Sequence, residues 1–467
     1  MMVGMAAEET RTKTPPDTPA KPVTAHGPAA DKNASTRAWT TRLLVTGIVL
    51  TALNLRPAIT SLGALLEEVR DGLGMSAGVA GVLTSVPPLC FAVFGVTAPR
   101  LARRFGPGAV VCAGMAAIAT GLLVRPFAGG VPVFLAASAL ALMGIAVSNV
   151  LMPVIVKRWF PDRVGSMTGL YSMALAMGTS VAAAATVPLT GALGGGWQTG
   201  LVMWSALAAA AVLPWIPFAR GGRAGRTEDG AARRAEPAAE ASSRAGRSGT
   251  GPSGDAAERP SGPHARVEPQ PGVLRITRSR TAWALAVFFG LQATAAYVTM
   301  GWMAQIFRDA GVAASTAGVL LAVTMVMGVP LAFVIPRLAA RLPRQGPIVL
   351  ALGACGLAGY AGLYLAPAGG AWIWAVLLGI SNCSFPLALT MVGMRARTGA
   401  GVAQLSAFAQ STGYLISVPG PLLVGVLYQH TGGWGVPIAL MAALMLPQMA
   451  VGVLAGRDRT VEEEAAR

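Results

Sequence analysis

The sequence predicts an all-α membrane protein with twelve transmembrane helices arranged as two six-helix bundles. Three observations lead to this prediction. Of the 467 residues, 54% are hydrophobic and only 12% are charged, whereas soluble domains usually carry about 25% charged residues. Apolar runs long enough to cross a bilayer core of about 30 Å recur along the whole chain. The two halves of the chain also repeat the same short motifs in the same order.

The apolar runs define twelve predicted spans, with boundaries read from hydropathy alone. They cover residues 43–66, 76–98, 107–125, 132–156, 164–188, 197–218, 281–305, 315–336, 347–366, 371–394, 402–427 and 435–455. The rest of the chain divides into a disordered tail over 1–42, a basic linker over 220–280 and a C-terminal tail over 457–467. The six-helix bundles therefore occupy residues 43–219 and 281–456.

The distribution of charge predicts the orientation in the membrane. The formal net charge is +16, and 32 of the 36 Lys and Arg fall in the two tails and in the loops on one side. Three, Arg70, Arg125 and Arg308, fall on the other side, and Arg56 lies inside a span. This asymmetry follows the positive-inside rule and predicts that both termini are cytoplasmic in a plasma-membrane protein. The excess of Lys and Arg therefore reflects the orientation of the chain in the membrane, and we expect no nucleic-acid partner.

The linker over 220–280 is rich in Arg, Ala, Gly, Pro and Ser and carries 12 Arg against 7 acidic residues. Such a composition buries too little apolar surface to fold. Two interpretations remain open, a solvated tether between the bundles and a segment that adheres to anionic lipid. The four cysteines have no paired spacing, which predicts neither a disulfide framework nor a metal site.

An internal repeat links the two bundles. The second span carries Gly81-Val82-Leu83 and is followed by Pro99-Arg100-Leu101-Ala102; the eighth shows the same pattern 237 residues later, at Gly318-Val319-Leu320 and Pro336-Arg337-Leu338-Ala339. Trp197 and Trp434 repeat at the same offset. Parallel repeats of six helices joined by a polar linker are typical of secondary transporters with two bundles.

Arg56 is the most informative residue because no other formal charge lies inside the predicted spans. At about 1.5 Å rise per residue it is too deep for its side chain to reach either interface. An unpaired charge at that depth costs a few kcal/mol or more. Pro57 removes a backbone hydrogen bond beside it and predicts a kink in the first helix. The sequence offers no carboxylate partner, so an anionic or strongly polar ligand is the expected one; a structural arginine bonded to helix carbonyls is the alternative.

Several motifs resemble the cyanate permease and 2-nitroimidazole transporter branch of the major facilitator superfamily. The resemblance rests on Asn54-Leu55-Arg56-Pro57-Ala58, on Leu83-Thr84-Ser85-Val86-Pro87 with Ala98-Pro99-Arg100-Leu101-Ala102-Arg103-Arg104, and in the second half on Phe385-Pro386-Leu387-Ala388-Leu389, Gln410-Ser411-Thr412-Gly413-Tyr414-Leu415, Gly420-Pro421 and Thr431-Gly432-Gly433-Trp434. It covers both bundles but neither the tails nor the linker. It implies the major facilitator fold, and it does not specify one solute.

The resemblance implies a central cavity lined by the first, fourth, seventh and tenth spans, beside the fifth, eighth and eleventh. Polar residues at mid-depth in these spans are the candidate solute-binding residues: Arg56, Asn54, Asn149, Tyr171, Gln292, Tyr297, Asn382, Gln410 and Tyr414. For most of them a hydrogen bond that only supports helix packing is the alternative role. The basic residues after the second and eighth spans, Arg100, Arg104, Arg337 and Arg341, are candidate gating residues. Pro99 and Ala102 stand where the wider superfamily usually has Asp and Gly.

No catalytic cluster, nucleotide motif or cofactor site is visible in the sequence, so we expect neither an enzyme nor an ATP-driven pump. The predicted function is secondary transport of a small, anionic or electron-rich solute by a monomer embedded in the lipid bilayer. Within the same superfamily the alternative is an exporter of drugs or metabolites. A membrane sensor or a membrane enzyme is a further alternative from another class. None of the 20 acidic residues lies at mid-membrane depth, so a buried carboxylate relay for proton coupling is not expected.

Overall fold

A computed structural model of the chain describes residues 28–219 and 276–465. The chain divides into two units, residues 1–43 and 44–467, and the fold described below is that of the second unit. Helix α1 (Pro28–Asn54) begins fifteen residues before the predicted start of the first span, so the prediction of disorder is wrong for residues 28–42. Residues 1–27, most of the predicted linker (220–275) and residues 466–467 lie outside the described residues.

Twelve spans in the described residues are long and apolar enough to cross a membrane, which confirms the predicted number and order. The first half holds α1 with α2 (Pro57–Ala64), α3 (Leu66–Leu73), α4 (Ala77–Phe105), α5 (Pro107–Val124), η1 (Arg125–Phe127), α6 (Val131–Trp159), η2 (Pro161–Arg163), α7 (Val164–Ala192), α8 (Trp197–Val212) and η3 (Leu213–Trp215). The described residues contain helices and turns but no strand, so the all-α class is also confirmed.

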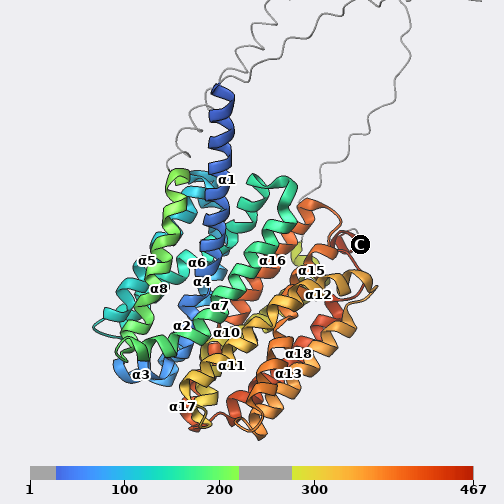
Figure 1. The fold of residues 1–467 in the computed structure, drawn as a ribbon. Coiled ribbons are helices and arrows are strands. Elements are labelled where there is room, and N and C mark those ends of the chain that lie inside the picture. Colours follow the sequence, from blue (N-terminus) through green and yellow to red (C-terminus); the bar gives the residue numbers. More distant parts are fainter. Residues whose placement is uncertain (1–27, 220–275, 466–467) are drawn as a thin grey trace, which may run out of the picture. The chain divides into compact units, whose positions relative to one another are not determined.

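The second half has the same number of spans, and three of these are divided into two α-helices each. It holds η4 (Ile276–Arg278), α10 (Arg280–Asp309), α11 (Ala314–Val326), α12 (Gly328–Arg341), α13 (Gly346–Leu365), α14 (Ala371–Asn382), α15 (Ser384–Met394), α16 (Gly399–Ser417), α17 (Pro419–Thr431), α18 (Gly435–Ala455) and α19 (Val461–Ala465). Figure 1 shows the first half in blue to green and the second half in yellow to red, lying side by side.

Local sequence explains where the helices begin and break. Ser76 and Ser279 cap α4 and α10, because each hydroxyl accepts a hydrogen bond from a backbone N–H three residues later. Proline stands in the first turn of α2, α5 and α17, where its missing N–H costs nothing. Breaks next to prolines divide the first span between α1 and α2 and the eleventh span between α16 and α17.

The two halves meet along helices that pack closely. Helix α4 contacts α16 and α17, α7 contacts α11, and α2 contacts α10. Small residues allow this approach, since a Cβ added at Gly63 would collide with the Met300 carbonyl oxygen and one at Gly318 would lie 2.7 Å from the Ala183 carbonyl oxygen. The residues between the halves are therefore in a position to form a site shared by both.

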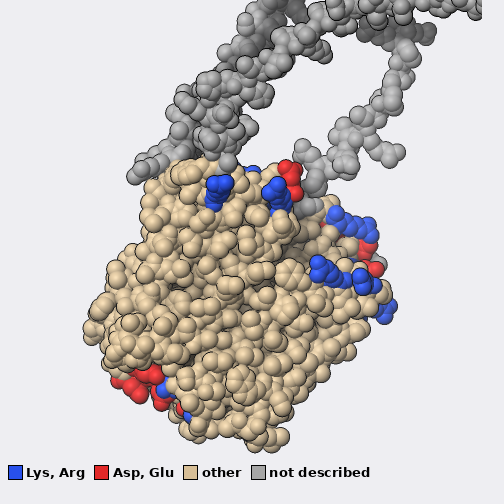
Figure 2. Space-filling view, viewed as in Figure 1, with Lys and Arg blue, Asp and Glu red and all other residues tan. Residues whose placement is uncertain are grey.

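The two opposite ends of the unit differ in the charged residues that they carry. We call the end that carries α3 and the last turn of α10 the Glu67 face. The other end, where α10 begins and α4 ends, we call the linker face. Figure 2 shows acidic side chains, with a few basic ones, gathered over α3, whereas most visible Lys and Arg lie at the opposite end.

Candidate functional site

Arg56 lies at the break in the first span. It is the N-terminal capping residue of α2, with φ −125° and ψ −27°. Its own carbonyl accepts hydrogen bonds from the backbone N–H groups of Ile59 (2.9 Å) and Thr60 (3.1 Å), so the chain re-enters a helix directly after it. The predicted disruption of the helix beside Pro57 is confirmed, and it projects a charged side chain from the middle of a span.

The guanidinium of Arg56 is surrounded by aromatic residues from both halves. Tyr297 of α10, Tyr414 of α16 and Tyr171 of α7 interact with it electrostatically, and its central carbon lies 5.9 Å from the ring centroid of Phe91 on α4. None of the four ion pairs between described residues includes Arg56. Its positive charge is therefore balanced only by the faces and hydroxyls of neutral rings.

Phe91, Tyr297 and Tyr414 form an aromatic group beside Arg56. The Phe91 and Tyr414 rings stack with centroids 4.9 Å apart, and the Tyr297 ring lies 6.5 Å from Phe91 and 6.4 Å from Tyr414. All three residues are buried. The Tyr297 hydroxyl lies beside the Arg56 guanidinium and donates no hydrogen bond to another described group, which leaves a buried donor available. Phe91 was missed in the sequence because a phenylalanine within an apolar span carries no polar signal.

Tyr171 and Asn149 extend this group towards α6. The Tyr171 hydroxyl donates a 2.5 Å hydrogen bond to the Asn149 side-chain oxygen. The bond joins α7 to α6 and fixes the side chain whose ring borders Arg56. The structure thus brings together five of the predicted solute-binding residues, Arg56, Tyr171, Asn149, Tyr297 and Tyr414.

Gln292 and Asn382 lie elsewhere, inside the second bundle. The Gln292 amide nitrogen is 3.5 Å from the Asn382 side-chain oxygen. Both residues line a cavity of about 10 Å³ with Tyr360 of α13 and Gln448 of α18. The Gln292 side-chain oxygen is buried without a partner. These residues form a separate polar cluster and not, in this conformation, the wall of the site around Arg56.

Two further candidates are occupied by contacts that support helix packing. The Asn54 amide nitrogen donates to the carbonyls of Leu50 (2.7 Å) and Leu207 (3.2 Å), so it ties α1 to α8. Gln410 donates to Ser406 one turn earlier on α16, at 2.7 Å. In this conformation Asn54 is buried, and its amide nitrogen is bound to helix carbonyls and not available to a solute.

The predicted gating arginines Arg100, Arg104, Arg337 and Arg341 are exposed at the linker face. Among their hydrogen bonds is one from Arg337 to the Phe333 carbonyl of its own helix. The closure visible between the halves is at the Glu67 face instead. Arg308 of α10 forms ion pairs with Glu67 (2.8 Å) and Glu68 (2.9 Å) of α3. The sequence placed these residues at span ends but could not show that they meet.

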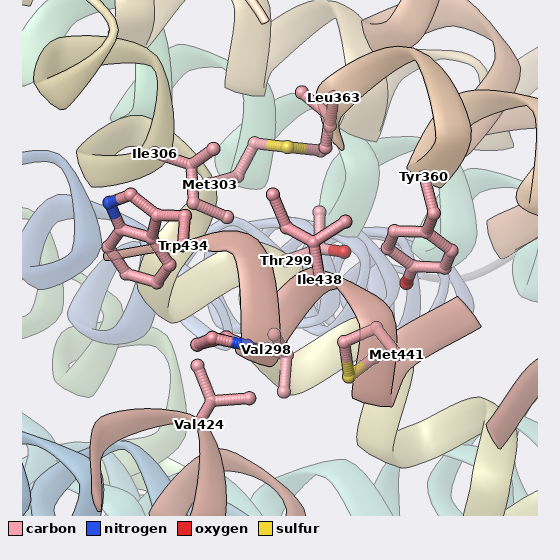
Figure 3. Close-up of a pocket in the computed structure, with 11 residues that line it drawn as sticks. Val298, Thr299, Met303, Ile306, Tyr360, Leu363, Val424, Trp434, Ile438 and Met441 are labelled. Atoms are coloured by element: carbon pink, nitrogen blue, oxygen red, sulfur yellow. The ribbon is translucent and has the colours of Figure 1, made fainter. Parts of the chain in front are cut away.

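A different cavity, of about 20 Å³, lies within the second bundle near the Glu67 face. Figure 3 shows its lining, which is almost wholly apolar and comes from α10, α13, α17 and α18. Thr299 and Tyr360 are its only hydroxyl-bearing lining residues. This cavity holds about one water molecule and has no charged group, so it offers little that could recognise a polar solute.

The comparisons with known proteins agree with this architecture. Residues 44–417 match the family model of the Major Facilitator Superfamily. The chain belongs to the major facilitator superfamily. It is 34% identical to the uncharacterized transporter YycB of Bacillus subtilis (strain 168), over 90% of this chain and 94% of that one. It is 30% identical to the 2-nitroimidazole transporter of Escherichia coli (strain K12), over 90% and 96%, and 26% identical to the cyanate transport protein CynX of that organism, over 83% and 90%.

Solved structures show the same major facilitator fold at low identity. A nucleoside transporter structure has a TM-score of 0.66 at 10% identity and covers 88% of this chain and 99% of its own. A peptide transporter in complex with sulfate has a TM-score of 0.63 at 15% identity, with coverages of 89% and 96%. This major facilitator protein is therefore a multi-pass membrane transporter of small solutes and not an enzyme.

Proposed function

We propose that the protein is a secondary transporter for a small anionic or electron-rich solute, cyanate-like or nitroimidazole-like, and that Arg56 binds this solute between the two halves. It acts as a monomer in the plasma membrane, with the linker face and both termini in the cytoplasm. The mechanism is alternating access: the two halves rock about the site, which then opens to one face of the membrane and afterwards to the other. Arg100, Arg104, Arg337 and Arg341 contribute to the gate at the cytoplasmic face.

The position of Arg56 supports an anionic ligand above all. A guanidinium at mid-span is costly when it has no counter-charge, and no carboxylate pairs with Arg56 among the described residues. An anion that accepts its hydrogen bonds removes this cost in the bound state. Because a guanidinium stays protonated at physiological pH, solute binding would not depend on protonation of this side chain.

The aromatic group beside Arg56 supports the proposal that the solute is electron-rich. Phe91, Tyr297 and Tyr414 present ring faces and edges beside the cation, which suits a flat, electron-rich molecule. The names of two relatives, a 2-nitroimidazole transporter and a cyanate transport protein, fit such solutes. The tight packing of these rings argues against an open apolar cavity of the kind expected in an exporter of large drugs.

The closed Glu67 face supports alternating access. Arg308 reaches across the halves to Glu67 and Glu68, and the Gln429 side-chain oxygen accepts a 2.8 Å hydrogen bond from the Gly78 backbone N–H of the other half. In the described residues the charged contacts between the halves lie at this face. Solute release on this side requires that they break.

The deciding experiment measures melting temperatures of purified wild type, Arg56→Lys and Arg56→Ala in detergent, with sodium cyanate and with 2-nitroimidazole. We expect both variants to need a much higher solute concentration than wild type for the same stabilisation, since an ammonium cannot reproduce the planar fork of a guanidinium. Without solute, Arg56→Ala should melt at or above the wild-type temperature because a costly intramembrane charge has been removed.

A pair of hydroxyl deletions provides the matched control. Tyr297→Phe removes a hydroxyl that lies beside Arg56 and donates no hydrogen bond to a described group, whereas Tyr360→Phe removes one inside the second bundle. We expect weaker solute binding only for Tyr297→Phe. An Arg56→Ala protein that is less stable without solute, yet still binds it with near-normal affinity, would show that Arg56 is structural and that the proposal is wrong.

A further inference from the structure

A second arginine is buried inside the first bundle, although the sequence places it at the end of a span. Arg125 lies in η1, directly after α5, and is 2% exposed. Its Nη1 donates a 3.1 Å hydrogen bond to the Ala58 carbonyl in the first turn of α2. The guanidinium also lies 5.8 Å from the Phe134 ring centroid. Arg125 therefore sits against the same helical turn that Arg56 begins.

The remaining donors of Arg125 have no partner. Both Nε and Nη2 are buried and make no hydrogen bond, and none of the four ion pairs between described residues includes this arginine. The N–H groups of Nε and Nη2 lie on one edge of the guanidinium and point in the same direction. This edge is the fork that binds two oxygens of a planar oxyanion at once.

The fork belongs to a cavity of about 20 Å³ between α2, α4, α6 and α10. Two hydroxyls of its lining, that of Ser138 on α6 and that of Tyr297 on α10, also donate no hydrogen bond to a described group. Unpartnered buried donors are rare in native proteins, and a small polar occupant of the cavity would satisfy these. Tyr297 also borders Arg56, so the cavity at Arg125 and the proposed solute site share this residue.

We propose that Arg125 and Ser138 form a second anion-binding site, between Arg56 and the Glu67 face, for a small monovalent oxyanion of the size of nitrate or cyanate. The Arg125 fork binds two acceptor atoms of a planar anion such as nitrate, and the Ser138 hydroxyl donates to a third. This inference rests on the proposed function in one respect: the anion held here is the solute on its way to or from Arg56.

The site must widen to receive an anion. At present the cavity has room for about one water molecule. It is closed by backbone contact between Gly63 and Met300, and a Cβ at Gly301 would lie 2.7 Å from the Thr84 side chain. Separation of α2 from α10 would break the first of these contacts and open the cavity towards the Glu67 face. Occupation of the site is thus tied to opening of that face.

The test measures the melting temperature of the full-length protein against sodium nitrate, exchanged for sodium gluconate at constant ionic strength. All variants carry Arg56→Ala, so that only binding away from Arg56 is observed. We expect nitrate to stabilise the Arg56→Ala protein and Arg125→Met to abolish this effect. Ser138→Ala should raise the half-saturating nitrate concentration about threefold to tenfold, as loss of one hydrogen bond does.

Ser148→Ala is the matched control, because Ser148 is an equally buried, unpartnered serine of α6 that faces Gly114 instead of the cavity. Ser148→Ala should leave the nitrate response unchanged. The comparison of Ser138→Ala with Ser148→Ala therefore tests the proposed anion site even when Arg125→Met does not fold. The cavity holds only an ordered water if nitrate does not stabilise the protein that carries Arg56→Ala as its single substitution. Equal nitrate responses of Ser138→Ala and Ser148→Ala would show the same. If instead wild type and Arg56→Ala respond alike to cyanate and 2-nitroimidazole while Ser138→Ala and Ser148→Ala differ in their nitrate response, the solute role of Arg56 fails but the Arg125 site stands.

Discussion

Arg125 and Arg395 are equally buried, but their surroundings differ completely. Each is 2% exposed. Arg125 uses one donor, on the Ala58 carbonyl. Arg395, at the linker face, donates to the carbonyls of Ala455 and Gly456 at 3.0 Å each and to the Gln345 side-chain oxygen. Burial alone therefore does not indicate whether an arginine is structural; these two differ in the number of donors left without a partner.

The largest expected effect is loss of stability in Arg395→Met. The substitution removes the hydrogen bonds to the Gln345 side-chain oxygen, the Ala455 carbonyl and the Gly456 carbonyl, of which Gly456 keeps a bond from the Gln345 backbone N–H. It should lower the free energy of unfolding by about 3 kcal/mol. Arg397→Met is the control, because its ion pair with Glu463 joins two exposed side chains and contributes little. Thermal unfolding in detergent without solute measures both. Equal melting temperatures for the two variants would show that the Arg395 network does not support the fold.

An intermediate effect is expected at the Glu67 face. Arg308→Gln removes both ion pairs across the halves, and we expect it to shift the equilibrium towards opening by about 1 kcal/mol, or roughly fivefold. Nitrate binding to the Arg56→Ala protein should then tighten by a similar factor. Glu67→Gln and Glu68→Gln alone should each retain transport with an unchanged proton response, because the other carboxylate still pairs with Arg308. Looser nitrate binding in Arg308→Gln would contradict the link between this face and Arg125.

The smallest effect is a pH dependence at Glu464 of α19. Burial raises the pKa of this carboxyl, but hydrogen bonds from Ser279 and Thr281 outweigh it, so the pKa is lowered overall. The carboxylate therefore stabilises the folded state above the ordinary glutamate pKa of about 4.3. This contribution is lost as pH falls through the lower pKa of the folded state. Melting curves between neutral and acid pH should show a steeper loss for wild type than for Glu464→Gln; parallel curves would argue against it.

Much of the fold could be predicted because hydropathy and the positive-inside asymmetry act on whole spans. Arg56 could be identified because a charge in an apolar span has few explanations. The sequence predicts that Arg125 lies in a loop, since an arginine at a span end normally extends to water and only the tertiary structure shows it folding back. It also predicts that Gln292 and Asn382 lie with Arg56, because a uniformly apolar helix does not reveal which face its polar residue occupies.

The C-terminal residues contact the rest of the protein more than the sequence predicts. A polar segment with three consecutive glutamates suggests a solvated tail, yet Val461 is buried and its backbone N–H donates to the Arg395 carbonyl. Glu462 accepts hydrogen bonds from the backbone N–H groups of Arg397 and Thr398. These partners are backbone groups at helix ends, and their proximity depends on how α15 and α16 begin and end in space. No local sequence pattern indicates that these helix ends lie close together.

The position of α19 has a consequence for the order of synthesis. Glu464 accepts hydrogen bonds from the Ser279 hydroxyl (2.6 Å) and from the backbone N–H and hydroxyl of Thr281 (3.1 and 2.7 Å). These groups begin α10, about 180 residues earlier in the chain. A ribosome makes α10 long before it makes α19, so the start of the second bundle must wait, inserted but incompletely bonded, until α19 has been translated. The five-residue helix α19 thus completes the bonding of a segment that entered the membrane about 180 residues earlier.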